Sequence, residues 1–210
     1  MSKAIIYTGG GAPTSIPSGL VQKGDYVIAA DSGYDTARRL GMHVDLCVGD
    51  FDSTSLSNEI KNRVHERSLR DKDESDTELA IKKAISMGYE SYCLVGGGGF
   101  RMDHLFATFS LFDRFGPPDL WYTGYEEVHL VRGYQRFESL KAGLHVSLFP
   151  TSFTKEAFIT AKQLQWPLEN HRLSMDTLSL SNRTTDSFLD VFAKQGGVLF
   201  VSFPVADKLP

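Results

Sequence analysis

The sequence predicts an α/β protein in which a mostly parallel sheet with flanking helices is followed by an antiparallel β-sandwich. Up to residue 123, short apolar runs alternate with helical patterns, which is typical of a parallel sheet covered on both faces. From about Glu126 the runs are partly alternating and are separated by Gly, Pro and Asn, which favours antiparallel strands in a sandwich or small barrel. The boundary is expected near Gly124, giving domains 1–124 and 125–210.

The N-terminal half contains five strand candidates, which are Lys3–Thr8, Tyr26–Ala30, Val44–Val48, Tyr92–Val95 and Leu120–Thr123. The helical patterns between them are Tyr34–Leu40, Leu56–Val64, Asp76–Met87 and Met102–Phe115. Several strands end in turn residues, in the stretches TGGG, ADSG, VGD and VGGGG. Open α/β sheets bind ligands beyond the carboxyl ends of their strands, so a site is expected at these loops.

The C-terminal half is expected to form strands at four short runs, EEVHLVRGY, LHVSLFP, DTLSLSN and GGVLFVSFP. Each run alternates in part between apolar and polar residues and is bounded by turn residues, as strands with one buried face are. These runs therefore predict the second, antiparallel domain.

Composition and charge narrow the function classes. The chain of 210 residues is 41% hydrophobic and 23% charged, and its net charge of −4 gives no broad electrostatic reason to bind nucleic acid or an anionic membrane. It has neither a signal-peptide pattern nor an apolar run long enough to span a bilayer, so a cytoplasmic protein is expected. Cys47 and Cys93 lie in apolar runs and are interpreted as reduced core residues, with a single disulfide as the open alternative.

The stretch GDFDS places two carboxylates, Asp50 and Asp52, directly after an apolar run. Carboxylates this close repel each other unless something positive lies between them, and a divalent cation would satisfy both. A plain turn is the alternative, because Gly, Asp and Ser are common turn residues. The five residues alone favour the turn.

A second acidic stretch, DKDESDTELA, covers residues 71–80. Ser75 and Glu78 form a capping box, and Asp76 at a helix start is favoured by the helix dipole. Asp71 and Asp73 precede the cap and are not needed for it. The helix has an apolar face and should be fixed against the sheet, so the acidic residues at its start are expected at the site.

The third stretch, GGGGFRMDH, covers residues 96–104. Four glycines permit close backbone approaches, and the helix that follows offers free N–H groups for a phosphate. Neither a dinucleotide fingerprint nor a P-loop is present. Arg101 suits phosphate, and Asp103 could complete a metal site, although a local salt bridge between them is the alternative. His104 is expected to be a surface or partly buried helix residue.

Three acidic loops at successive strand ends, with glycines and an arginine, predict that Asp50 and Asp52 help to hold Mg²⁺ for chemistry on a polyphosphate. Magnesium is usually bound by a few carboxylates together with waters and phosphate oxygens, which this arrangement suits.

The sequence resembles the thiamine pyrophosphokinase family through nearly its whole length. Six blocks in order carry the resemblance: ADSG (30–33), GDFDS (49–53), DKDESDTELA (71–80), GGGGFRMDH (96–104), QWPL (165–168) and LSN (180–182). The resemblance implies Mg²⁺-dependent transfer of pyrophosphate from ATP to the thiamine hydroxyl, giving thiamine diphosphate and AMP. It also implies an N-terminal α/β catalytic domain, a C-terminal β-sandwich that receives thiamine, and a homodimer with shared active sites.

The resemblance assigns roles to individual positions. Five match the family's acidic metal and catalytic positions, namely Asp50, Asp52, Asp73, Asp76 and Asp103, the first four of them as metal ligands. The ATP-binding positions are Asp31, Gly96, Gly97, Gly98, Gly99 and Arg101. The thiamine-binding positions are Trp166, Ser181 and Asn182. Without the resemblance, Trp166 is interpreted as a core residue and Ser181-Asn182 as a turn.

The chain departs from the family pattern at several positions. Phe100 interrupts the usual Gly-Gly-Arg, Thr108 replaces an Asn, and Arg183 replaces a Glu. Where the family has Gly-Leu-Lys-Trp, this chain has Gln163-Leu164-Gln165-Trp166. These departures affect the shape of the thiamine pocket more than the reaction. A Mg²⁺-dependent nucleotide phosphohydrolase and a non-catalytic nucleotide sensor are the alternative functions.

Overall fold

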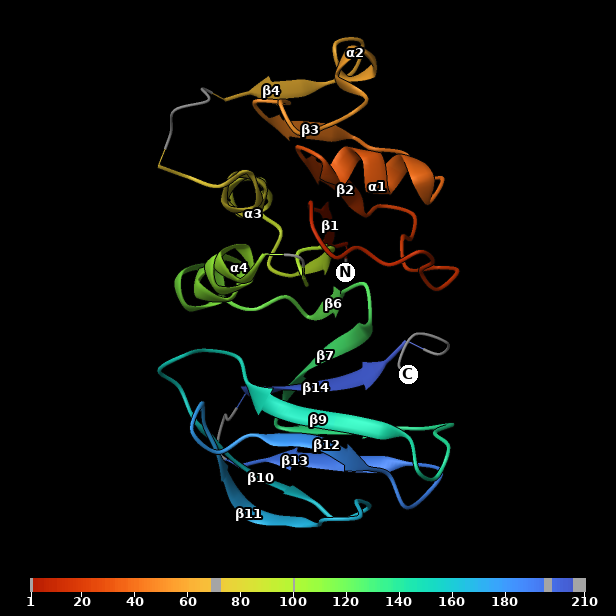
Figure 1. The fold of residues 1–210 in the computed structure, drawn as a ribbon, viewed down its shortest axis with the longest axis vertical. Helices are drawn as coiled ribbons and strands as arrows, with labels where there is room; N and C mark the ends of the chain where they lie inside the picture. Colours follow the sequence, from red (N-terminus) through yellow and green to blue (C-terminus); the bar gives the residue numbers. More distant parts are fainter. Residues whose placement is uncertain (1, 69–72, 100, 195–197, 206–210) are drawn as a thin grey trace. The chain divides into compact units, whose positions relative to one another are not determined.

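The computed structural model describes residues 2–68, 73–99, 101–194 and 198–205, and the chain divides into two compact units (Figure 1). Unit 1 comprises Met1–Leu111 and Leu120–Tyr125, and unit 2 comprises Phe112–Asp119 and Glu126–Pro210. Sequence reasoning places a single boundary near Gly124. The structure instead assigns the end of one helix and the segment after it to unit 2.

Unit 1 contains a parallel sheet with the strand order β6-β5-β1-β2-β3-β4. Its strands are β1 (Ala4–Tyr7), β2 (Tyr26–Ala30), β3 (Leu46–Gly49), β4 (His65–Arg67), β5 (Tyr92–Val95) and β6 (Leu120–Tyr122). Its helices are α1 (Gly33–Arg39), α2 (Ser57–Ile60), α3 (Asp76–Ser86) and most of α4 (Met102–Phe115). In Figure 1, α1 and α3 lie on opposite sides of the central strands.

The packing of α1 depends on one glycine. Gly33 begins this helix directly above β1, and a Cβ there would collide with the carbonyl oxygen of Tyr7. The absence of a side chain lets the helix approach the strand closely. Tyr34 and Ala37 then join the buried core of unit 1, and both are fully buried.

One predicted helix is wrong. The predicted helix Leu56–Val64 is helical only over α2 (Ser57–Ile60). Strand β4 begins at His65, directly after the end of the predicted helix. The residues of β4, His-Glu-Arg, are exposed, so they carry none of the apolar alternation that predicts a strand. Parallel pairing with β3 holds β4 in place through its backbone, which a side-chain pattern cannot reveal.

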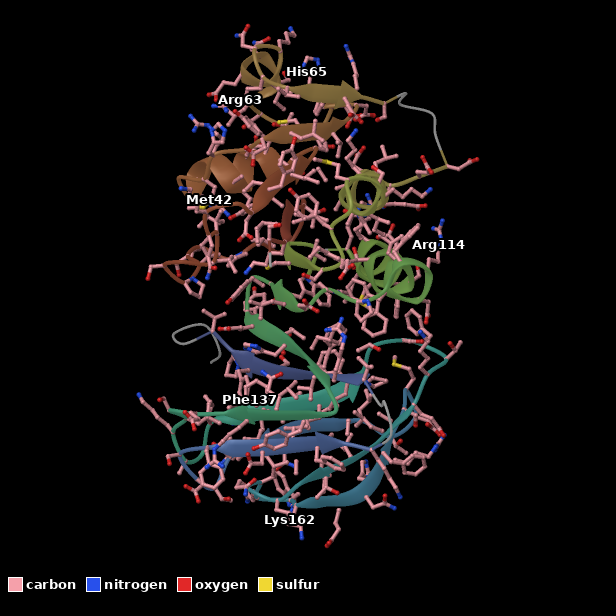
Figure 2. All side chains as sticks on the ribbon, turned by 180° about the vertical axis from the view of Figure 1, so that it is seen from behind. Met42, Arg63, His65, Arg114, Phe137 and Lys162 are labelled. Carbon is pink, nitrogen blue, oxygen red and sulfur yellow. The ribbon has the colours of Figure 1, made fainter. Side chains whose placement is uncertain are left out.

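Unit 2 contains two antiparallel groups of strands, in the orders β12-β9-β14-β7 and β11-β10-β13-β8. The first group comprises β7 (Glu126–Arg132), β9 (His145–Pro150), β12 (Ser179–Arg183) and β14 (Val198–Pro204). The second comprises β8 (Tyr134–Phe137), β10 (Ala157–Ala161), β11 (Leu168–Leu173) and β13 (Leu189–Ala193). Apolar side chains from both groups form one buried core, to which Phe137 of β8 belongs (Figure 2).

The predicted fold class is confirmed: a parallel sheet with helices is followed by an antiparallel β-sandwich. All four C-terminal runs form strands. The sequence analysis missed β8, β10, β11 and β13, which together make the second sheet of the sandwich.

Two further features bear on the sequence-based expectations. Among the described residues, no helix is both long and apolar enough to cross a membrane. Cys47 and Cys93 are buried and are not joined in a disulfide, as expected, and burial raises the pKa of the Cys47 thiol to about 11. Such a thiol stays protonated near neutral pH and is a poor nucleophile.

We predict that Leu148→Ala lowers the free energy of unfolding by about 2–5 kcal/mol, because it leaves a cavity in the sandwich core. Leu148 on β9 is fully buried between its neighbours on β14 and β12. The matched control is Leu180→Ala on β12, whose side chain is 61% exposed. Urea unfolding followed by circular dichroism measures both variants, and equal losses would contradict the assigned core.

Candidate functional site

Unit 1 contains a cavity of about 420 Å³ that is lined by loops at the ends of several of its strands. The loops after β1, β2, β3 and β5 line it, together with the first turns of α3 and α4. This is the carboxyl-end edge of the parallel sheet, where the sequence places the site. The cavity therefore lies among the predicted acidic and glycine-rich segments.

Three carboxylates meet at this edge: Asp31, Asp50 and Asp76. Asp31 follows β2, Asp50 follows β3, and Asp76 is the first residue of α3. One oxygen from each lies within 4.8 Å of the others. Three negative charges this close repel one another, so a cation among them would stabilise the group.

Asp31 is the most constrained of the three. Its side chain is 7% exposed, and its Oδ1 is buried without a hydrogen-bond partner among the described residues. Burial raises the pKa of Asp31, and the neighbouring Asp76 and Asp50 raise it further, against hydrogen bonds from Ser32 and Ser53 that lower it. A buried carboxylate oxygen that lacks a partner is unfavourable unless a proton or a cation satisfies it.

Gly49 makes the approach of these carboxylates possible. It has a φ of 136°, and a Cβ built on it would lie 3.1 Å from Oδ1 of Asp76 and 3.2 Å from Cβ of Asp31. A side chain here would fill the space between the two acidic residues. Glycine is therefore required for both its conformation and its small size.

Asp52 and Asp73 lie outside this group of three. Asp52 is exposed, its backbone N–H donates to Oδ1 of Asp50 at 3.2 Å, and its own Oδ1 accepts a hydrogen bond from Ser53 at 2.9 Å. Asp73 is exposed on the segment that leads into α3. Asp71 lies outside the described residues. Ligand roles for Asp52 and Asp73 stay predictions.

The first turn of α3 is held as the sequence predicts. Oγ of Ser75 accepts a hydrogen bond from the N–H of Glu78 at 3.1 Å, which caps the helix. The hydroxyls of Thr77 and Thr8 share a hydrogen bond of 2.5 Å, which links α3 to the loop after β1. Asp76 is thus presented from an anchored helix start.

Two glycine loops pack backbone against backbone at the other side of the cavity. The N–H of Gly97 donates to the carbonyl of Gly10 at 2.5 Å, and a Cβ on Gly11 would lie 2.6 Å from the nitrogen of Gly99. Gly97 and Gly99 line the cavity. Gly96 and Gly98 allow close packing: a Cβ on Gly96 would collide with the carbonyl oxygen of Thr8, and one on Gly98 with the side chain of Thr123.

Arg101 lines the cavity and pairs with Asp103. Its Nε donates to Oδ1 of Asp103 at 3.1 Å, and its Nη2 donates to Oδ2 at 2.5 Å. The paired guanidinium lowers the pKa of Asp103, and the carboxylate raises that of Arg101. The local salt bridge between Arg101 and Asp103, which was the alternative interpretation, is therefore present. It orients the guanidinium of Arg101, a residue that lines the cavity.

His104 and Thr108 also line the cavity, although the sequence analysis expected no site role for His104. His104 is exposed and Thr108 is 6% exposed. The signal that could have included them is that His104 and Thr108 are four residues apart on α4, shortly after Arg101, and residues four apart on a helix share a face. Thr8 was missed as well, and its signal was its place at the start of TGGG, directly after a strand.

In unit 2, hydrogen bonds join Trp166 and Asn182, and Ser181 directly precedes Asn182. Asn182 is 2% exposed; its Oδ1 accepts from the N–H of Trp166 at 3.2 Å, and its Nδ2 donates to the carbonyl of Trp166 at 2.8 Å. Asn182 therefore holds the backbone of Trp166, whose side chain is 57% exposed and not a core residue. Ser181 is exposed, has a φ of 52°, and donates its N–H to Oγ of Ser147 at 3.1 Å.

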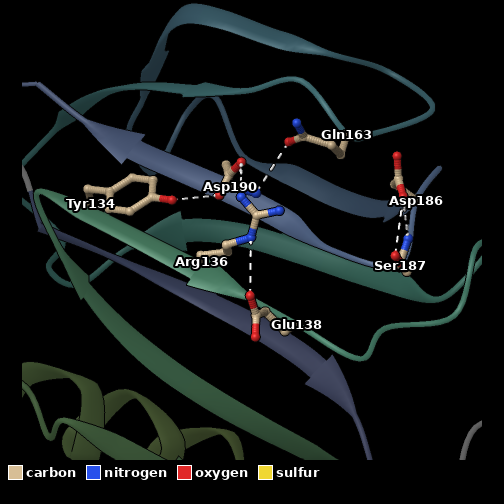
Figure 3. Close-up of polar contacts among 7 residues, drawn as sticks. All are labelled: Tyr134, Arg136, Glu138, Gln163, Asp186, Ser187 and Asp190. Atoms are coloured by element: carbon tan, nitrogen blue, oxygen red, sulfur yellow. Dashed lines mark hydrogen bonds and ion pairs between the residues drawn. The ribbon is translucent and has the colours of Figure 1, made fainter.

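Gln163, one of the departures from the family pattern, anchors the same segment from its other end. Its Oε1 accepts a hydrogen bond from the N–H of Asp190 at 3.2 Å (Figure 3). Asp190 in turn accepts from the hydroxyl of Tyr134 at 2.8 Å and pairs with Arg136 at 3.4 Å. The side chain at position 163 thus ties the segment before Trp166 to β13 and β8.

Comparisons with known proteins agree with this fold. Residues 18–117 match the family described as "Thiamin pyrophosphokinase, catalytic domain". None of the curated proteins matches the sequence. This match confirms the predicted similarity to the thiamine pyrophosphokinase family over residues 18–117, which contain the first four of the six sequence blocks and lie mostly in unit 1.

The fold is also similar to solved structures of thiamine pyrophosphokinases. The Bacillus subtilis structure has 19% identity and a TM-score of 0.74, covering 97% of this chain and 100% of that chain. The Geobacillus thermodenitrificans structure has 23% identity and a TM-score of 0.73, covering 99% of each chain. The Candida albicans structure has 14% identity and a TM-score of 0.69, covering 97% of this chain and 89% of that chain.

We predict that Mg²⁺ stabilises the protein and that Asp31→Asn removes much of this effect. A ligand at about 100 times its dissociation constant adds about 2.7 kcal/mol to the free energy of unfolding. Asn keeps the size of Asp and tolerates its φ of 45°, so the variant should fold. In EDTA it should be at least as stable as the wild type, because one repelling charge is gone.

Thermal unfolding with and without Mg²⁺ measures this prediction. The control is Asp186→Asn, which changes an exposed carboxylate in unit 2 and should keep the full Mg²⁺-induced rise in Tm. An equal rise in Asp31→Asn and the wild type would contradict a cation site at Asp31.

Proposed function

We propose that this chain, whose residues 18–117 match the thiamin pyrophosphokinase catalytic domain, transfers pyrophosphate from ATP to the hydroxyl of thiamine. The products are thiamine diphosphate and AMP. The observation that carries the proposal is the cavity of unit 1, which is lined by Asp31, Asp76, glycine loops and Arg101, with Asp50 close to the two carboxylates. Acidic residues for a metal and donors for phosphates are the parts that phosphoryl transfer requires.

Asp31, Asp50 and Asp76 would hold Mg²⁺. Their oxygens are the ligand type that Mg²⁺ prefers, and the unpartnered Oδ1 of Asp31 is available to it. When bound, the ion neutralises charge on the phosphate oxygens and helps to orient them. Asp52 and Asp73, which are exposed on the same two acidic loops, would contact the ion or its waters.

Arg101 and the glycine loop would bind the phosphates of ATP. The guanidinium offers several donors in a plane that suits phosphate oxygens. Asp103 holds it by two hydrogen bonds, so less freedom is lost when a phosphate binds. The loop Gly96–Gly99 has no side chains that would block a close approach of phosphates to its backbone.

The chemical step is an in-line attack by the thiamine hydroxyl on the β-phosphorus of ATP, with AMP leaving. The O–P bond to thiamine forms, the bond to AMP breaks, and a carboxylate accepts the hydroxyl proton. Asp73 and Asp103 are the candidate bases. Its pairing with Arg101 lowers the pKa of Asp103, which weakens Asp103 as a base.

Trp166, Ser181 and Asn182 would receive thiamine in unit 2. Thiamine carries a permanently cationic ring, and the face of a tryptophan attracts such a cation by about 1 kcal/mol or more once water is excluded. The exposed side chain of Trp166 on an anchored backbone suits this role. We also propose a homodimer with shared active sites, as the sequence resemblance implies.

The proposal is tested by incubating the protein with Mg²⁺ and ATP, with and without thiamine, and identifying the nucleotide product. Thiamine-dependent AMP is the expected result. Thiamine-independent turnover would indicate a phosphohydrolase, and no turnover a nucleotide sensor. Asp50→Asn should abolish the activity while leaving the fold intact, because it removes a proposed metal ligand at a strand end.

We predict that Trp166→Ala weakens thiamine binding at least several-fold and leaves ATP binding almost unchanged. The loss falls on the contact with the cationic ring, so Trp166→Phe should keep part of the affinity. Isothermal titration with each substrate measures both constants. Equal weakening of thiamine and ATP would indicate a structural defect instead.

Subunit exchange tests the shared site. If the acidic loops of one chain act with Trp166 of the partner chain, Asp50→Asn and Trp166→Ala homodimers should complement each other when assayed at a thiamine concentration too low for Trp166→Ala sites to turn over. A mixed dimer then contains one site with both lesions and one intact site. Random mixing makes half of the dimers mixed, so about a quarter of wild-type activity should return. No recovery after verified exchange would contradict a shared site.

A further inference from the structure

We propose that Asp35, on α1, is a positioning residue for the acidic group, and this inference rests on the proposed function. The residue belongs to none of the acidic stretches singled out in the sequence. It lies four residues after Asp31 on the chain, in the first turn of α1. Its carboxylate contacts the segment that follows Asp50.

Both oxygens of the Asp35 carboxylate are used in that contact. Oδ1 accepts a hydrogen bond from Oγ1 of Thr54 at 2.6 Å. Oδ2 accepts one from the N–H of Ser55 at 2.9 Å and another from its Oγ at 3.0 Å. Thr54 is 9% exposed, so the first of these bonds is largely shielded from water. Hydrogen bonds to a charged acceptor are stronger than neutral ones.

These bonds join the two segments that carry Asp31 and Asp50. Asp31 directly precedes α1, and Thr54 lies four residues after Asp50. Asp35 therefore fixes the start of α1 to the end of the GDFDS loop. Movement of this loop would change the distance between two of the three carboxylates.

The backbone around Asp50 requires such an anchor. Gly49 has a φ of 136° before it, and Phe51 has a φ of 62° after it. A left-handed conformation is unfavourable for a residue with a side chain. Phe51 packs against the core of unit 1, which fixes one side of the turn, and the bonds of Asp35 fix the next residues.

A simple role in starting the helix does not account for these contacts. Acidic residues are favoured in the first turn of a helix, and Asp35 benefits from that. Yet the hydrogen bonds that its two oxygens accept come from Thr54 and Ser55, which lie outside α1. Asp35 is therefore placed like a residue that does not touch the metal but orients its ligands. Mutation of such a residue typically weakens metal binding by about 10–100-fold.

The test is direct binding of Mn²⁺, a stand-in for Mg²⁺, measured from the free-ion signal in electron paramagnetic resonance. Asp35→Asn should weaken binding about tenfold, because an amide cannot accept at both ends. Thr54→Val should weaken binding in the same direction, and Thr54→Ser, which keeps the hydroxyl, should restore it.

Glu59→Gln is the matched control. The Glu59 carboxylate accepts from the hydroxyl of Tyr34 and from Nε of Arg38, both at 3.2 Å. It therefore ties α1 to α2, away from the GDFDS loop, and its change should lower the Tm without altering Mn²⁺ binding.

The outcomes separate this inference from the proposed function. Wild-type affinity in folded Asp35→Asn and Thr54→Val would overturn the positioning role and leave the metal site intact. If the wild type binds no Mn²⁺, both the metal site and the positioning role fail. If Asp35→Asn does not fold, Thr54→Val with its Thr54→Ser counterpart decides the question.

Discussion

The mutual repulsion of Asp31, Asp50 and Asp76 is the constraint on which the rest of the site depends. Two unit charges 4.8 Å apart repel by about 3 kcal/mol at an effective dielectric constant of about 20. Three such repulsions are large compared with the free energy of unfolding of a typical protein, which is about 5–15 kcal/mol. The chain nevertheless fixes these residues close together, with Asp31 buried. A bound cation would relieve this repulsion, which is the role proposed for Mg²⁺ at this site.

The surrounding fold holds this unfavourable group from several directions. Gly49 leaves the space between Asp31 and Asp76, the Ser75 cap and the Thr8–Thr77 hydrogen bond fix the start of α3, and Asp35 fixes the loop after Asp50. The Thr8–Thr77 hydrogen bond and the Asp35–Thr54 hydrogen bond each link two different segments at this edge of the sheet. Ligands that the fold already holds in place would lose less conformational entropy on binding an ion. The repulsion that lowers the stability of the free protein would therefore be accompanied by a higher affinity for a cation.

Much of the fold could be predicted because its signals are local. The buried strands of unit 1 are short apolar runs, and α4 was predicted with its exact bounds. The exposed β4 carries no such pattern, since pairing with β3 holds it through the backbone. Asp31 could be placed in the site by its strand-end position, but its grouping with Asp50 and Asp76 depends on distances across the sheet. Likewise, nothing near Asp35 in the sequence indicates that its partners are Thr54 and Ser55.

The most direct test of the central claim is a crystal structure with Mn²⁺, in which anomalous scattering locates the ion without reference to the protein. The account predicts an anomalous peak bound by carboxylate oxygens of Asp31, Asp50 and Asp76. A peak at other residues, with Oδ1 of Asp31 bound to a proton or a water instead, would contradict it.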